Sequence, residues 1–216
     1  MKIQTSELLF ERIADDLAWR KKEIAVFSAE VRRSNPDVQR ALLRASVAML
    51  YAHWEGFVKN SCHWYLCFLA SQRLTTQKVR PEIAALAIRG RLLGLEQSRR
   101  IQGHVDVVRM IREEATARIL IPTSRDDVRT ESNLSYRVLM DVLTSIGCPT
   151  DMYDEFQDLI DENLVASRNR VAHGEFTAIA ETEWSELKDR VVSLMDSVAN
   201  QVIDAAANQT YLAWRA

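Results

Sequence analysis

The sequence predicts an all-α bundle of four or five long helices with a mostly helical insertion in the middle. Apolar residues recur at helical spacing over long stretches, and 216 residues contain only six Gly and four Pro, which favours long uninterrupted helices. The composition, 47% hydrophobic and 27% charged, is typical of soluble globular proteins. We expect a single domain over residues 1–216, with a scaffold of about 1–72 and 132–213 and an insertion of about 73–131.

The first two predicted helices carry the clearest apolar patterns. One runs from about residue 6 to 33 and ends before Pro36, which restricts the residue that precedes it. The next runs from about 37 to 71. Its apolar residues are alternately four and three apart, as in the seam of a helix bundle: Leu43, Val47, Leu50, Trp54, Phe57, Ser61, Trp64 and Phe68.

The rest of the chain is less regular at first and then periodic again. Short helices are expected at 81–95 and 105–118, followed by a polar loop at 123–132. A helix from about 134 to 146 ends at Gly147. Another runs from about 150 to Gly174, which suits the left-handed position after a helix end. The last begins near 182, with acidic residues at its positive end.

The apolar runs, the N-terminus and the cysteines of the sequence indicate the cellular compartment in which the protein is expected. No apolar run approaches the roughly 18 residues of a membrane span, and the N-terminus does not resemble a signal peptide. The three cysteines, Cys62, Cys67 and Cys148, form no disulfide framework. We therefore expect a cytoplasmic protein that does not contact a membrane.

The charge is unevenly distributed. Residues 73–118 contain ten Lys/Arg and five Asp/Glu, a net +5, whereas residues 149–216 contain five Lys/Arg and thirteen Asp/Glu, a net −8. A basic middle segment can attract a polyanion, or it can be a solvated helix face. If it guides RNA, the densest run supplies the contacts: Arg89, Arg91, Arg99 and Arg100.

Residues 166–176, "ASRNRVAHGEF", contain the strongest candidate for chemistry. RNA cleavage requires a proton to leave a 2′-hydroxyl and another to reach the departing 5′-oxygen, and a histidine suits both steps near neutral pH. A guanidinium can hold the phosphate. His173 and Arg168 supply these groups, and Asn169 can orient one of them. Alternatively, His173 caps the helix end and Arg168 pairs with a nearby carboxylate.

One geometric difficulty accompanies this hypothesis. Arg168 and His173 are five positions apart, which places them about 140° apart around an ideal helix. A single straight helix cannot direct both side chains at one phosphate.

The segment 168–174, Arg-Asn-Arg-Val-Ala-His-Gly, closely resembles the motif of HEPN domains, in which an arginine and a polar residue precede a histidine. The stretch "YAHWEGFVKNSCHWYLCFL" at 51–69 is similar to the second helix of the MAE-type HEPN subgroup, with its Trp-Glu-x-Phe core. The resemblance covers the helical scaffold and not 73–131. It implies a metal-independent endoribonuclease without a cofactor, often a toxin or antiphage effector, that works as a homodimer with facing motifs.

The same resemblance assigns roles to the motif. Arg168 binds phosphate, His173 is the general acid and base, Asn169 orients, and Arg170 is an auxiliary cation. The expected partners are RNA, a second copy of the chain, and an antitoxin or defence-system protein. The alternative is a non-catalytic HEPN module that binds a partner protein or a nucleotide.

Polar residues of the 51–69 stretch are weaker candidates. Glu55 and Lys59 are four apart, in the favourable order for an ion pair, and either form a surface pair or assist the site. His53 lies beside the apolar seam and is expected to be packed. His63 and Cys67 can share a metal by spacing, but no further ligand follows regularly, so no metal site is expected.

Overall fold

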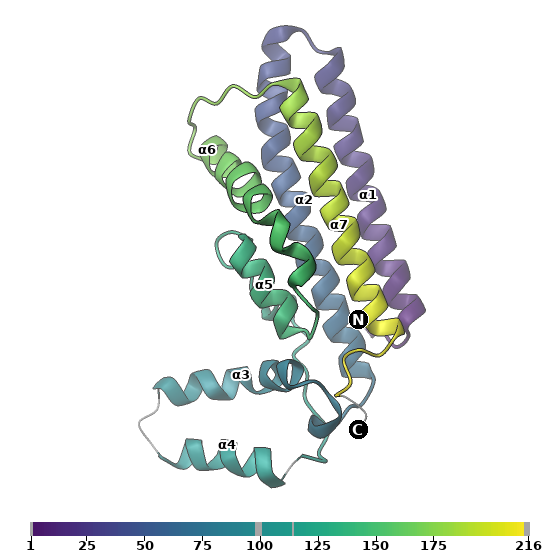
Figure 1. Ribbon diagram of the computed structural model, residues 1–216, viewed down its shortest axis with the longest axis vertical. Coiled ribbons are helices and arrows are strands. Elements are labelled where there is room, and N and C mark those ends of the chain that lie inside the picture. Colours follow the sequence, from purple (N-terminus) through teal and green to yellow (C-terminus); the bar gives the residue numbers. More distant parts are fainter. Residues whose placement is uncertain (1, 98–100, 114, 214–216) are drawn as a thin grey trace.

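The computed structural model describes residues 2–97, 101–113 and 115–213, and it confirms the all-α prediction. Within these ranges the regular structure is helical, apart from two isolated bridges, Thr75–Arg118 and Val79–Leu212. Figure 1 shows the long helices side by side, with shorter helices along one flank. The long helices are α1 (Ser6–Arg33), α2 (Pro36–Ser71) and α7 (Glu181–Ala207).

The shorter elements lie between α2 and α7 in the chain. They are α3 (Pro81–Gln97), α4 (Ile101–Glu113), α5 (Tyr136–Ser145) and α6 (Ser167–Ala172), with 3₁₀ turns at Thr76–Lys78 and Arg125–Asp127. The hairpin of α3 and α4 projects at the end of the bundle where the termini lie, whereas α5 and α6 lie beside α2 (Figure 1). The chain then crosses from α6 to the opposite end of the bundle, where α7 begins.

Helix ends follow the residues that the sequence offers. Thr5 Oγ1 accepts a hydrogen bond from Leu8 N at 3.3 Å, and Asn35 Oδ1 accepts one from Val38 N at 3.1 Å. These side chains satisfy amide donors that lack a partner in the first turn. Gly147 and Gly174 adopt φ of 77° and 75° after α5 and α6, as expected from their positions.

Two predicted helices differ from the structure. The second helix of the insertion is Ile101–Glu113, so the expected range of 105–118 was shifted toward the C-terminus. The expected single helix over 150–174 is instead a 3₁₀ segment, Asp151–Phe156, a π-helix, Leu159–Ala166, and then α6. A π-helix closes its hydrogen bonds over five residues, so side-chain positions derived from regular α-helical rotation fail across it.

A buried polar network holds α1 against α2. Arg20 and Asp16 form an ion pair at 2.7 Å, with both side chains less than a tenth exposed, and Arg20 Nη1 also donates to the backbone oxygen of His53 at 3.2 Å. His53 is packed in this network as expected; burial, helped by the nearby Arg20 guanidinium, lowers its pKa. The absence of a side chain at Gly56 lets Arg20 approach α2 closely. A Cβ at this position would lie 3.0 Å from Arg20 Nη1.

The Arg20–Asp16 pair generates a stability prediction. Asp16→Ala should lower the free energy of unfolding by about 3–5 kcal/mol, because it leaves a buried guanidinium without its counter-charge. Urea denaturation followed by circular dichroism measures the change. Arg33→Ala is the matched control: Arg33 is 77% exposed and pairs with Glu30 at 3.6 Å, so its removal should matter by less than about 0.5 kcal/mol. Equal effects of the two substitutions would contradict the structural role of the pair.

Candidate functional site

Arg168 lies in the first turn of α6, directly after the π-helix ends at Ala166. Its side chain turns toward α2, where the guanidinium carbon stands 4.6 Å from the centroid of the Tyr51 ring. A cation over an aromatic face is attracted by the ring quadrupole, more strongly where water is excluded. Arg168 is only partly exposed and Tyr51 is buried, so this contact fixes the arginine against the bundle.

Two amide oxygens complete the surroundings of Arg168. Its Nη1 donates to Asn133 Oδ1 at 2.8 Å and to Asn169 Oδ1 at 2.7 Å. Among the described residues, no carboxylate forms an ion pair with Arg168, so the expected alternative of a carboxylate partner is not what the structure shows. Both hydrogen-bond partners are neutral, so they do not cancel the charge of the guanidinium.

Tyr51 is itself held in place by the chain segment just before α5. Its hydroxyl oxygen accepts a hydrogen bond from Leu134 N at 2.8 Å. Burial raises the pKa of Tyr51 to about 12, and the Glu55 carboxylate one turn away adds to this rise. The phenol is therefore neutral at physiological pH and supports the guanidinium through its ring.

His173 follows α6 as the C-cap residue and is exposed. Its backbone N–H donates to Asn169 O at 2.9 Å, and Arg44 of α2 donates from Nη2 to Glu175 O at 2.9 Å, which ties down the segment after the histidine. Within the described part of the chain, the imidazole makes no hydrogen bond. The Asn169 side chain thus holds Arg168 and not His173.

The two ends of the motif therefore face different surroundings. Residues Ser167–Ala172 are α-helical, so the separation of about 140° expected between Arg168 and His173 persists. Arg168 faces α2 and the chain at Asn133, whereas His173 faces solvent. One copy of the chain presents an anchored cation and a free imidazole in different directions.

The auxiliary residues do not join the Arg168 cluster as a group. The Arg170 Nη2 donates to Ser167 Oγ at 3.0 Å, and its side chain lines a separate cleft of about 420 Å³ against α7. Glu55 lies beside Tyr51, and within the described ranges it forms no ion pair with Lys59, so the alternative of a Glu55–Lys59 surface pair is not what the structure shows. Lys59 approaches Asp126 instead, at 3.5 Å.

The arginines expected to bind RNA are only partly placed. Arg89 is exposed and lines a cavity together with Lys59, and Arg91 is exposed on α3. Arg99 and Arg100 lie outside the described residues. His63 and Cys67 approach each other to 3.8 Å, yet in the described ranges no three His, Cys, Asp or Glu residues gather as a metal site would require.

Comparison with known proteins identifies the fold family. The family model described as HEPN_MAE_28990-like HEPN matches residues 9–211. The chain belongs to the MAE-type HEPN family. This match includes the stretch 73–131, which the motif resemblance alone does not cover. No curated protein and no solved structure matches the chain. None of the helices in the described ranges is long and apolar enough to cross a membrane.

Two residues of the site were missed by reasoning from the sequence. Tyr51 lies within the stretch that resembles the second HEPN helix, and its position one turn before Glu55 was an available signal. Asn133 comes from a loop and gave no signal. Two residues before it, Glu131 adopts the left-handed conformation with φ of 54°.

The different surroundings of Arg168 and His173 predict different costs of removing them. His173→Ala should change the free energy of unfolding by less than about 1 kcal/mol, because the imidazole is exposed. Arg168→Ala should cost about 2 kcal/mol, since it removes the contact with Tyr51 and leaves two amide oxygens without a donor. Thermal and urea denaturation measure both. A His173→Ala variant that unfolds would show that the histidine is structural.

Proposed function

We propose that this HEPN-type module is a metal-independent endoribonuclease that acts as a toxin or antiphage effector. The observation that carries the proposal is the environment of Arg168. Its guanidinium is partly buried and has neutral partners, and among the described residues it forms hydrogen bonds through Nη1 only. Nη2 and Nε are left to bind phosphate oxygens. A preorganised cation of this kind suits the charge that builds on a phosphate during cleavage.

The proposed reaction transfers phosphorus between two oxygens of the RNA. His173 takes the proton of the 2′-hydroxyl, and that oxygen attacks the adjacent phosphorus. The bond from phosphorus to the 5′-oxygen breaks, and an imidazolium returns a proton to this leaving oxygen. The products are a 2′,3′-cyclic phosphate and a 5′-hydroxyl. Arg168 stabilises the extra negative charge, and Asn169 orients Arg168 through its amide oxygen.

Purified protein should therefore cleave single-stranded RNA in the presence of EDTA, because the proposed steps use only an imidazole and a guanidinium. His173→Ala should lower the rate at least about 100-fold, in line with the usual contribution of general acid–base catalysis. Gel analysis with end-group chemistry identifies the products. The matched control is His104→Ala, since His104 is exposed on α4 and belongs to no proposed site. Strict dependence on magnesium would contradict the mechanism, and RNA binding without cleavage would favour the non-catalytic HEPN module.

The separation of Arg168 and His173 leads us to propose a composite site in a homodimer. In a two-fold interface the same surface of both copies meets, so the arginine of one chain can lie opposite the histidine of the other. The unpaired guanidinium groups would repel each other mildly in the empty site, which favours a bound phosphate. An antitoxin or defence-system protein that covers the two motifs would keep the enzyme inactive in the cytoplasm.

Co-expression of Arg168→Ala and His173→Ala chains with different tags tests the composite site. The isolated heterodimer keeps one intact pairing of Arg168 with His173, so it should recover activity well above both mutant homodimers. Sedimentation at the assay concentration confirms the dimer, and wild-type chains carrying the same two tags serve as the control. A fully active monomer would rule out the composite site.

A further inference from the structure

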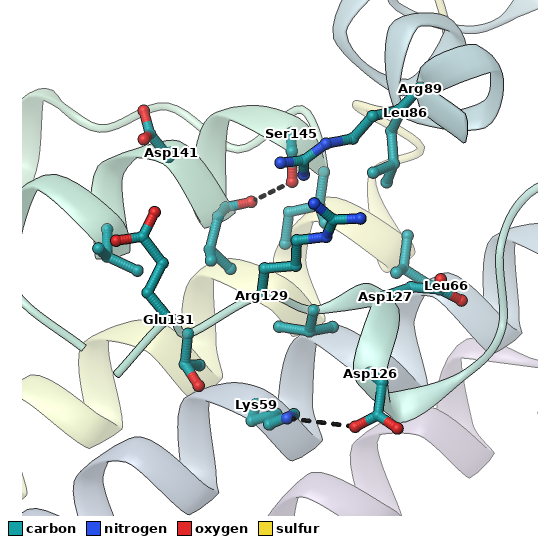
Figure 2. A pocket seen from close by; sticks show the side chains of 15 residues that line it. Lys59, Leu66, Leu86, Arg89, Asp126, Asp127, Arg129, Glu131, Asp141 and Ser145 are labelled. Atoms are coloured by element: carbon teal, nitrogen blue, oxygen red, sulfur yellow. Dashed lines mark hydrogen bonds and ion pairs between the residues drawn. The ribbon is translucent and has the colours of Figure 1, made fainter. Parts of the chain in front are cut away.

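A second polar cavity lies between α3, α5 and the chain segment 126–131. Its volume is about 360 Å³, and Lys59 of α2 reaches it from below (Figure 2). This volume is at the lower end of the range for small-molecule sites. The apolar residues that line it are Leu66, Leu86, Val128, Val138, Val142 and Ile146.

Two arginines converge in this cavity from different elements. Arg89 comes from α3 and Arg129 from the 126–131 segment, and Figure 2 shows both guanidinium groups reaching toward the same place near Ser145. Among the described residues neither arginine forms an ion pair. Two like charges that approach each other without a counter-charge are unfavourable, and an anion between them removes the repulsion.

The carboxylates that line the cavity do not occupy the space between the Arg89 and Arg129 guanidinium groups. Glu131 and Asp141 lie on the side away from the two guanidinium groups (Figure 2). Asp127 is engaged with Ser124 N at 2.7 Å, in the cap of a short helical turn. Lys59 is 20% exposed and its partner Asp126 is 91% exposed, so their ion pair at 3.5 Å is weak and gives way readily to a stronger anion.

The cavity and the Arg168 cluster lie along the same helix, α2. On α2, Tyr51, Glu55 and Lys59 follow one another at intervals of four residues, so Lys59 is about 12 Å along the helix from the tyrosine that supports Arg168. A stacked strand covers this distance in roughly three to four nucleotides. Along the chain, four residues lead from Arg129 in the cavity to Asn133 on the Arg168 guanidinium.

We propose that this cavity is a second phosphate subsite for the RNA substrate. Arg89 and Arg129 hold a backbone phosphate of the same strand whose scissile phosphate binds at Arg168, Lys59 attracts the strand from the α2 side of the cavity, and the apolar lining receives the adjoining ribose or base. The inference rests on the proposed function, because it assumes that RNA is the ligand of the Arg168 site.

The test measures binding and not cleavage. The His173→Ala protein is titrated with a fluorescent ten-nucleotide RNA at several salt concentrations, with and without Arg89→Gln and Arg129→Gln. Removal of both guanidinium groups should weaken binding at least about tenfold, as expected for charge-assisted hydrogen bonds. The slope of log affinity against log salt should fall by about 0.7 for each phosphate that the protein no longer neutralises.

Arg137→Gln is the matched control, because Arg137 is an exposed arginine of α5 that does not line the cavity. It should change the RNA affinity less than about twofold. Circular dichroism confirms that the double variant folds. Inorganic phosphate is titrated in parallel, to distinguish a cavity that binds a free anion from one that binds a phosphate of an RNA strand.

The outcomes are distinct. RNA affinity and salt slope that are unchanged in the double variant overturn the inference. Phosphate binding that disappears while RNA binding is unchanged assigns the cavity to a free anion and also overturns it. A wild-type protein that binds RNA through these arginines and never cleaves it refutes the proposed catalysis and leaves the subsite standing.

Discussion

The contact of Arg168 with Tyr51 is the interaction on which the candidate site depends. A guanidinium that is partly withdrawn from water needs partners, and here they are an aromatic ring and two amide oxygens in place of a carboxylate. A carboxylate partner would hold the arginine equally well but would cancel its charge. Neutral partners fix the position and preserve the charge, and a phosphate site requires both.

The π-helix directly precedes Arg168 and changes which residues around it face the bundle. In a regular helix, Ile160, Leu164 and Val171 share one apolar face, and Arg168 only borders it. The π-helix Leu159–Ala166 changes this phase: Ile160 and Leu164 stay buried, Val165 joins them, and Val171 is only partly covered. Such local insertions into helices are common at functional sites, because they redirect side chains without breaking the helix.

The parts of the fold that depend on neighbouring residues were predictable, and those that depend on distant ones were not. Local caps and apolar periodicity set the ends of α1 and α2, and Gly147 and Gly174 end their helices as expected. The motif itself was also visible. The loop that folds back on α2 supplies the contacts that were not predicted: Asn133 at Arg168, Arg129 in the cavity, and Asp126 as the ion-pair partner of Lys59. Apolar periodicity does not encode where such a loop folds.

Helix α2 links stability to the site because it carries polar groups on two sides. Toward α1, His53 and Gly56 meet the buried Arg20–Asp16 pair. Toward α6 and the 126–134 segment, Tyr51 and Lys59 contact Arg168, Leu134 and Asp126. A buried ion pair adds little net stability compared with apolar packing, but it accepts few alternative registers. Both members of the pair lie on α1, and the pair reaches α2 through the hydrogen bonds from Arg20 Nη1 to His53 O and from Asn60 Nδ2 to Asp16 Oδ1. A shift of α2 along α1 would break these two contacts and would at the same time move Tyr51 away from Arg168.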